Sequence, residues 1–318
     1  MSDFTITIVG TGVIGTSLGL ALKQQADPPR LIAHDKELTI SQAAVSKGAF
    51  DKAEWNLVNA CESADLIIFA MPLNGIHLTL EAIAPYLKPG VVITDTCRSA
   101  TTVQNWAKKL LPDHAHFISG DPLVTPNGVG YQHAHANLFK GRPYCLIPSP
   151  QASEEAMQTV VNLIGLLEAE PFFLDAAEHD GLITTMEPLP ALLGVALFNT
   201  LTRQPSWRES RKFAGRLFEQ VSAGAVGNPD AVAADWLASR ANLVHWLDRY
   251  LEQLQQIRHL LLATESEPEP LAQLIDKAVV ERYNWQQDYE AGRFIDPELT
   301  IKVEPPPGFM KRWMGLGR

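Results

Sequence analysis

The chain has 318 residues, of which 46% are hydrophobic and 19% are charged, and its formal net charge is −10. This length suits about two domains, and the composition is that of an ordinary globular protein. Surfaces that bind nucleic acids or anionic membranes need clustered positive charge, so the acidic balance argues against both kinds of partner.

Targeting and redox signals favour a cytoplasmic protein. The first ten residues, MSDFTITIVG, lack a basic segment followed by a long apolar run, so no signal peptide is expected. No stretch is expected to reach the ~20 apolar residues that span a bilayer. The three cysteines, Cys61, Cys97 and Cys145, are few and widely spaced, which fits reduced thiols better than a disulfide framework.

The first half of the chain, residues 1–174, alternates β-rich runs with helical patterns. Strands are expected at 4–10, 30–35, 65–72, 90–95, 116–119, 144–149 and 171–174, and helices at 13–26, 76–87 and 153–168. Strands that alternate with helices favour a parallel sheet covered on both faces. This half is therefore predicted to be a doubly wound, Rossmann-type α/β domain.

A glycine-rich turn follows the first predicted strand. The segment VGTGVIG places Gly10, Gly12 and Gly15 in the spacing G-x-G-x-x-G, directly before a helix. The first glycine permits a tight turn, the second lets a pyrophosphate approach the backbone, and the third lets helix and strand pack closely. The context predicts a dinucleotide site, although a tight turn without a phosphate remains the alternative.

An acidic residue ends the second predicted strand. Asp35 lies about twenty residues beyond the glycines, where a carboxylate accepts hydrogen bonds from the adenosine ribose. It would repel a 2′-phosphate, which favours NAD, whereas the neighbouring Lys36 weakens that preference and keeps NADP as the alternative. The predicted cofactor-binding residues are Gly10, Thr11, Gly12, Val13, Ile14, Gly15, Asp35, Lys36, Met71 and Pro72.

The second half of the chain is predicted to be helical. Over 234–262, apolar residues recur at three- and four-residue steps, which predicts one broad apolar helix face packed in its own domain or against a partner subunit. The residues of that face are Leu237, Leu243, Trp246, Leu247, Tyr250, Leu251 and Leu254. Another helix is expected at 270–288. The predicted domains are thus 1–174 and a helical domain at 175–292, followed by a Pro/Gly-rich irregular tail at 293–318.

Chemistry in such a fold is expected beyond the carboxyl ends of the strands, where DTCRSA and GDPLV place Arg98 and Asp121. Asp121 is interpreted either as a catalytic base, as an ion-pair partner of Arg98, or as a turn-forming residue before Pro122. An adjacent guanidinium is expected to lower the pKa of this carboxyl below its usual value near 4. No metal site is expected, because the His-x-His spacings at 114–116 and 133–135 lack a third ligand.

Taken together, several segments resemble the prephenate/arogenate dehydrogenases of tyrosine biosynthesis. GTGVIGTSLGLALK is similar to the family opening, ADLIIFAMPL and PYLKPGVVITD to its middle strands, and AAEHDGLIT to the segment with its His-Asp pair, here His179 and Asp180. GYQHAHANLFKGRPYCLIPSP contains the family's Leu-Phe-x-Gly pattern. The resemblance implies NAD(P)-dependent oxidative decarboxylation of a cyclohexadienol and a helical domain that forms a homodimer. It also implies that His179 and Asp180 connect the two domains structurally.

The resemblance also implies that the family's reactive residues are exchanged. Its His-Pro-Met-Ala-Gly loop, whose His takes up the substrate hydroxyl proton, corresponds to DPLVT at 121–125. Its Asp-x-x-Ser motif, whose Ser hydrogen-bonds that His, corresponds to DTCR at 95–98. Its Ser-His-Leu-Pro-His segment and its carboxylate-binding Thr-Arg pair correspond to EPLPA at 187–191 and SA at 222–223.

Two of these exchanges are expected to be linked, because Arg98 and Asp121 could form a bidentate charge-assisted hydrogen bond where Ser and His pair in the family. In the catalytic interpretation Asp121 accepts the proton, Arg98 holds a substrate carboxylate, and Thr125 and Glu187 face the substrate. Glu187 is alternatively a solvated charge at a helix start, since Pro188 suits a first helical turn.

Three functions follow from these observations. The first is an NAD(P)-dependent dehydrogenase of the prephenate/arogenate type that acts on a small hydroxy-carboxylate. The second is a dinucleotide-binding sensor or partner protein without turnover, favoured by the simultaneous loss of several reactive groups. The third, a β-hydroxyacid dehydrogenase, is suggested by GDPLV, but PLPALLGVALFNTL lacks the catalytic lysine expected on the following helix.

Overall fold

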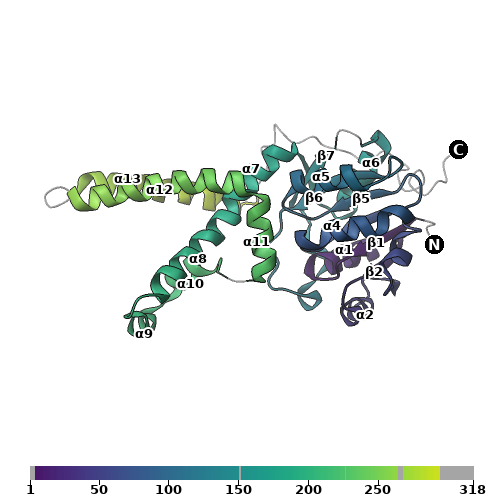
Figure 1. Cartoon of the computed structure of the whole chain (residues 1–318), viewed down its shortest axis with the longest axis horizontal. Helices are drawn as coiled ribbons and strands as arrows, with labels where there is room; N and C mark the ends of the chain where they lie inside the picture. Colours follow the sequence, from purple (N-terminus) through teal and green to yellow (C-terminus); the bar gives the residue numbers. More distant parts are fainter. Residues whose placement is uncertain (1–3, 150–151, 226, 264–267, 294–318) are drawn as a thin grey trace. The chain divides into compact units, whose positions relative to one another are not determined.

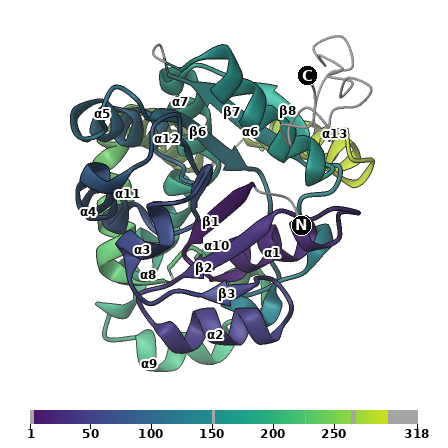
Figure 2. The same cartoon turned by 90° about the vertical axis from the view of Figure 1, so that its right-hand side faces the viewer.

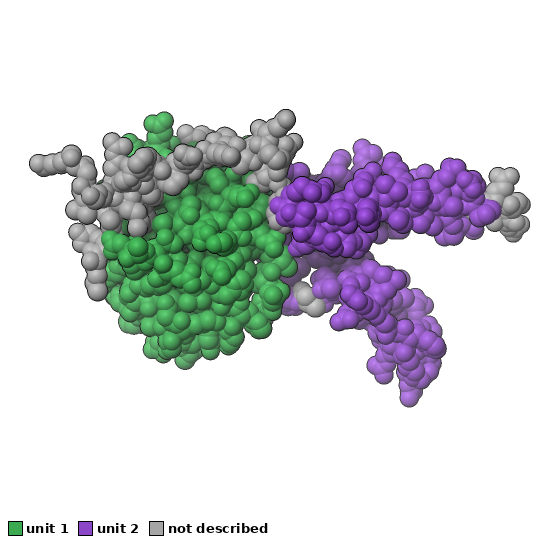
Figure 3. Space-filling model, turned by 180° about the vertical axis from the view of Figure 1, so that it is seen from behind, with its two compact units in different colours: residues 1–180, 300–318 green, residues 181–299 purple. Residues whose placement is uncertain are grey.

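The computed structural model describes residues 4–149, 152–225, 227–263 and 268–293. They divide into two compact units, one ending at Asp180 and the other beginning at Gly181, which are coloured separately in Figure 3. The predicted irregular tail lies outside the described residues from 294 onward.

The first unit is built on one eight-stranded sheet of order β3-β2-β1-β4-β5-β6-β7-β8. Figure 2 labels the strands toward its two edges, β1 to β3 and β6 to β8. Its strands are β1 (Thr5–Val9), β2 (Arg30–His34), β3 (Lys52–Ala53), β4 (Leu66–Phe69), β5 (Val92–Asp95), β6 (His116–Pro122), β7 (Pro143–Pro148) and β8 (Glu170–Phe173). Its helices are α1 (Val13–Lys23), α2 (Leu38–Ser46), α3 (Leu57–Cys61), α4 (Leu73–Ile83), α5 (Ala100–Leu110) and α6 (Glu154–Leu166). The predicted doubly wound α/β fold is confirmed.

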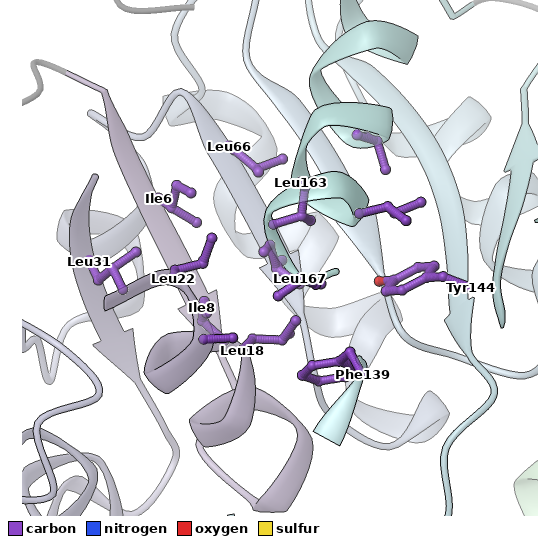
Figure 4. Close-up of a cluster of buried hydrophobic side chains, with 14 of the residues drawn as sticks. Ile6, Ile8, Leu18, Leu22, Leu31, Leu66, Phe139, Tyr144, Leu163 and Leu167 are labelled. Carbon is purple, nitrogen blue, oxygen red and sulfur yellow. The ribbon is translucent and has the colours of Figure 1, made fainter. Parts of the chain in front are cut away.

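Apolar side chains of the strands are buried beneath helices on both faces of the sheet. On one face, Leu18 and Leu22 of α1 and Leu163 of α6 pack against Ile6 and Ile8 of β1 (Figure 4). On the other face, Ala100 of α5 packs against Cys145 and Ile147 of β7. Strands buried on both faces read as continuous runs of β-branched and other apolar residues, as β4 (LIIF) does.

Two features of β6 differ from the sequence-based prediction. The strand continues to Pro122, so Asp121 lies inside it, opposite Cys145 of β7, and not in the loop beyond. In addition, β7 runs antiparallel to β6, whereas the other pairs in the sheet are parallel. A parallel neighbour needs a long crossover, usually a helix, and the segment between these two strands contains only two short 3₁₀ turns.

Helices α8 (Pro188–Thr202), α9 (Trp207–Ser210), α10 (Arg216–Ser222), α11 (Pro229–Ala238), α12 (Arg240–Ala263) and α13 (Glu269–Glu290) form the second unit, and α7 (Ala176–Met186) leads into it (Figure 1). The helix predicted at 234–262 is divided into α11 and α12 at Ser239. Of its predicted apolar face, Leu243 is buried, whereas Trp246, Tyr250 and Leu254 are exposed within one chain.

One helical stretch, Ala176–Thr202, is long and apolar enough to cross a membrane. By length and composition this stretch departs from the expectation that none exists, because two of its acidic residues, Glu178 and Asp180, lie at its start and only Glu187 lies further along. Length and composition alone are weak evidence for a membrane span.

Candidate active site

The glycine-rich turn between β1 and α1 has the backbone geometry that its spacing predicts. Gly10 has φ +98°, which favours glycine, and a Cβ there would overlap the carbonyl oxygen of Ala70 after β4. A Cβ at Gly15 would overlap the carbonyl oxygen of Gly10 itself, so α1 could not pack this closely on the turn. A Cβ at Gly12 would have no neighbour within 4 Å, which leaves open space at the helix N-terminus for a phosphate.

Asp35 is held beside this turn. Its Oδ2 accepts hydrogen bonds from the Thr11 backbone N–H at 2.8 Å and from Thr11 Oγ1 at 3.1 Å. Its Oδ1 accepts one from the Glu37 N–H at 3.1 Å. The adjacent Lys36 is exposed. The carboxylate is thus fixed at the carboxyl end of β2, where it retains lone pairs for a ribose hydroxyl.

The end of β4 also lies at the turn. A Cβ built on Gly10 would lie 3.1 Å from Met71 Cβ, so the two segments are in contact. Pro72 is the exposed N-cap residue of α4. The structure therefore brings together the glycine turn, Asp35 and Met71, and this arrangement fits a dinucleotide.

A second cluster lies at the carboxyl ends of β5 and β6. Asp121 is 1% exposed, and its Oδ2 lies 3.2 Å from Nε2 of His179, which is 2% exposed. His179 Nδ1 lies 3.1 Å from Oδ1 of Asp180. Asp180 in turn accepts hydrogen bonds from the first two residues of α5, the Ala100 N–H at 2.8 Å and the Thr101 N–H at 3.0 Å. An imidazole is thus held between two carboxylates.

Arg98 lies nearest to the other carboxylate oxygen of Asp121. Its Nε is 3.9 Å from Asp121 Oδ1, and 42% of its side chain is exposed. The two residues form an ion pair, as one interpretation of the sequence predicted. The predicted bidentate hydrogen bond is wrong, because 3.9 Å exceeds hydrogen-bonding distance and Asp121 instead hydrogen-bonds His179.

Burial and charge perturb the protonation of this cluster. Burial raises the pKa of Asp121, against the opposing effects of the His179 hydrogen bond and the Arg98 charge. The expected lowering by Arg98 is therefore wrong in its net direction, since desolvation of the carboxylate dominates. Burial lowers the pKa of His179, but hydrogen bonds to Asp121 and Asp180 outweigh it and raise the pKa to about 9.

Asp95 adds another buried carboxyl at the end of β5. Its Oδ1 accepts a hydrogen bond from the Gly120 N–H at 3.0 Å, and the carboxyl is fully buried. Burial raises the pKa of Asp95 to about 8, and the nearby Asp121 charge adds to this rise. Burial of Asp95 thus favours the neutral form of its carboxyl.

The sequence predicts a structural role for His179, and the structure adds that its ring contacts Asp121. The His-Asp pair in AAEHDGLIT is the sequence signal that points to this residue. Of the two predicted substrate residues, Thr125 is exposed in the segment after β6, and Glu187 belongs to the second unit, directly before α8. Over the described ranges no group of three or more His, Cys, Asp or Glu side chains could hold a metal ion.

Comparisons with known proteins match both halves of the chain. Residues 18–171 match the family model of the prephenate dehydrogenase nucleotide-binding domain, and residues 175–276 match that of the prephenate dehydrogenase dimerization domain. Prephenate dehydrogenase of Bacillus subtilis is 24% identical over 256 residues, which cover 80% of this chain and 69% of that protein. Cyclohexadienyl dehydrogenase of Zymomonas mobilis is 22% identical over 264 residues, which cover 82% and 90%.

A solved structure shows the same fold. The crystal structure of prephenate dehydrogenase from A. aeolicus, in complex with hydroxyphenyl propionate and NAD+, superposes with a TM-score of 0.81 at 18% identity. The match covers 89% of this chain and 99% of that one. With a nucleotide-binding domain followed by a dimerization domain, the chain belongs to the prephenate dehydrogenase family.

Proposed function

We propose that this protein is an NAD-dependent dehydrogenase that oxidises a small hydroxy-carboxylate of the prephenate or arogenate class. The observation that carries the proposal is a half-exposed Arg98 in front of a buried acid–imidazole cluster, at the carboxyl ends of β5 and β6. Ligands of doubly wound sheets bind at these strand ends. Buried ionisable groups with perturbed pKa values also concentrate at functional sites.

The cofactor would be held by the glycine turn and by Asp35. The open space at Gly12 and the N-terminus of α1 suit a pyrophosphate, and the carboxylate of Asp35 suits a ribose diol and disfavours a 2′-phosphate. When bound, NAD supplies a hydride acceptor, so oxidation of the substrate alcohol leaves one proton for the protein to take up. The relative from A. aeolicus was solved with NAD+.

The substrate would be held and deprotonated by Arg98 and Asp121. The guanidinium of Arg98 is exposed enough to meet a carboxylate in a charge-assisted hydrogen bond. Asp121 Oδ1 faces Arg98, and the raised pKa of this carboxyl makes it a stronger base than an ordinary aspartate. Thr125 and Glu187 remain proposed as substrate contacts on sequence grounds.

The protein is further proposed to act as a homodimer in the cytoplasm. The second unit belongs to a dimerization-domain family, and helices α12 and α13 expose large apolar side chains within a single chain. Exposed apolar patches of this kind are typical of surfaces covered by a partner. The three cysteines are buried and free, which supports a reducing compartment. Light scattering of the purified chain should give twice its 35.0 kDa mass.

A direct assay tests the proposed activity. Purified protein is incubated with NAD or NADP and with prephenate or arogenate, and NADH or NADPH formation is followed together with cofactor affinity. We expect turnover with NAD on at least one substrate and weaker binding of NADP. Cofactor binding without turnover on either substrate would contradict the activity while leaving the nucleotide site intact.

One observation favours a second candidate, a dinucleotide-binding protein without turnover. Asp121 is only 1% exposed, and its two carboxylate oxygens face His179 and Arg98. A base must come within hydrogen-bonding distance of the proton that it removes, so this carboxylate has to become accessible in the substrate complex. The assay above separates the two candidates.

A further inference from the structure

In the proposed dehydrogenase reaction Arg98 binds the substrate and Asp121 takes up a proton, whereas the imidazole of His179 has no role. His179 is 2% exposed, with both ring nitrogens directed at carboxylates. Burying an imidazole between two acids is costly unless each of its N–H groups is used. The arrangement therefore calls for an explanation beyond packing.

A continuous series of contacts runs from Arg98 through Asp121 and His179 to Asp180, and it ends at helix α5. Arg98 faces Asp121 Oδ1, Asp121 Oδ2 faces His179 Nε2, and His179 Nδ1 faces Asp180 Oδ1. Asp180 is itself fixed by two backbone N–H groups in the first turn of α5. Anionic side chains are favoured at a helix N-terminus, so the far end of the series is anchored by α5.

Three carboxyl groups and one guanidinium lie near His179. Asp121 lies on β6, Asp180 on α7 and Asp95 on β5, and Arg98 lies beyond Asp121. Asp121 and Asp180 outweigh the cost of burial and raise the pKa of His179 to about 9. Only an imidazole that carries both protons can donate to Asp121 and Asp180 at once, because the neutral ring has one N–H.

We propose that His179 is a positioning residue for the dehydrogenase: its Nε2–H holds Asp121 Oδ2 while Asp180 orients the ring, so that Asp121 Oδ1 is left to receive the substrate proton. This inference rests on the proposed function. In the proton step the substrate O–H bond breaks and an O–H bond forms at Asp121 Oδ1. The substrate carbon loses a hydride to NAD, the oxidant named in the proposed function, and a C=O bond forms.

A purely structural His179 would tie α7 to β6 without affecting the chemistry. The two roles differ in their pH dependence. If His179 positions Asp121, kcat falls as the imidazolium loses a proton near pH 9, since the neutral ring can no longer donate to both acids. A structural tie predicts a pH profile that does not depend on residue 179.

The decisive experiment compares pH profiles of kcat and KM for the wild-type protein and His179→Gln. A glutamine side chain can meet one of the two carboxylates but cannot bridge Asp121 and Asp180 as the imidazolium does, and it cannot titrate. We expect kcat at pH 7 to fall by about 100-fold, the scale on which a displaced catalytic group loses rate. The KM of the carboxylate substrate should stay within about twofold, because Arg98 is retained, and the alkaline limb should disappear.

Three further variants test whether an effect comes from misfolding or from another titrating group. Asp180→Asn keeps the shape of the partly exposed Asp180 but removes one charge from His179, so the alkaline limb should move to lower pH. Asp95→Asn should leave the limb in place, although Asp95 titrates in a nearby range. His114→Gln is the matched control, since His114 Nε2 lies 3.1 Å from the Leu87 carbonyl, away from the cluster, and its replacement should leave activity unchanged.

The outcomes distinguish this inference from the proposed function. A wild-type protein that turns over no substrate contradicts the dehydrogenase and this inference with it. An active wild-type protein with unaltered kcat and pH profile in His179→Gln overturns the role of His179 alone. An alkaline limb that survives in His179→Gln and vanishes in Asp95→Asn assigns the titration to Asp95 and also overturns it. If His179→Gln does not fold, an unshifted limb in folded Asp180→Asn overturns it.

Discussion

Arg98 and Asp121 show how burial reverses an expectation based on neighbouring charge. A guanidinium beside a carboxylate ordinarily lowers the pKa of that carboxyl. Here Arg98 is half-exposed and 3.9 Å away, whereas Asp121 is almost entirely buried. Desolvation therefore dominates and raises the pKa of Asp121. The two residues thus divide into an accessible cation and an inaccessible acid.

Substitution of the accessible cation should affect substrate binding most. In Arg98→Met the substrate carboxylate loses a charge-assisted hydrogen bond, so KM should rise on the order of 10- to 100-fold. Arg98→Lys should recover part of this loss, because it restores the charge without the planar geometry. Steady-state kinetics with the proposed substrate measure both effects. An unchanged KM in Arg98→Met would show that Arg98 does not bind the carboxylate, and the affinity for NAD serves as the control.

At the scale of elements, the packing of α1 on the β1–α1 turn decides whether the nucleotide site exists. Gly15 lies on the first turn of α1 and has no room for a Cβ, whereas Gly12, one turn earlier on the chain, faces open space. The two glycines of one motif therefore have different physical roles. Gly15 allows α1 to pack closely on the turn, and Gly12 leaves space for the cofactor phosphates.

A matched pair of alanine variants separates these roles. Gly15→Ala should lower the free energy of unfolding by about 2 kcal/mol or more, because its Cβ meets a backbone carbonyl that cannot rotate away. Gly12 has extended backbone angles, φ −68° and ψ −159°, which alanine also adopts. Gly12→Ala should therefore keep the free energy of unfolding of the wild-type protein but lose NAD affinity. Urea unfolding and cofactor titration test the pair. Equal destabilisation of both variants would contradict this division.

For the whole molecule, the buried cluster predicts how stability changes with pH. The pKa values of His179 and Asp95 are raised in the folded state to about 9 and about 8. A group whose pKa is higher in the folded state than in the unfolded state favours folding at pH values below its unfolded-state pKa. That contribution is lost as the pH rises through its folded-state pKa. The window is thus roughly pH 6.5 to 9 for His179 and pH 4 to 8 for Asp95.

The free energy of unfolding should accordingly fall between pH 6 and pH 9, with His179 contributing on the order of 2 kcal/mol. Urea unfolding of the wild-type protein and of His179→Gln at both pH values measures this difference, and the variant should lose less. The lowered pKa values of Asp51 and Glu54 act with the opposite sign but at acidic pH, outside this window. A wild-type stability that rises toward pH 9 would show that the imidazole is neutral in the folded protein.

Local sequence patterns determined much of the fold and of the predicted nucleotide site. The glycine spacing, Asp35 at the end of β2 and the alternation of strands and helices all depend on stereochemistry within a few residues or one repeating unit, so they can be read along the chain. The Asp121–His179 contact joins residues 58 positions apart, from a strand and a helix. Only packing could decide it, together with the burial that sets both pKa values. The antiparallel turn from β6 to β7 likewise arises in three dimensions, because no helix in that segment returns the chain for a parallel strand.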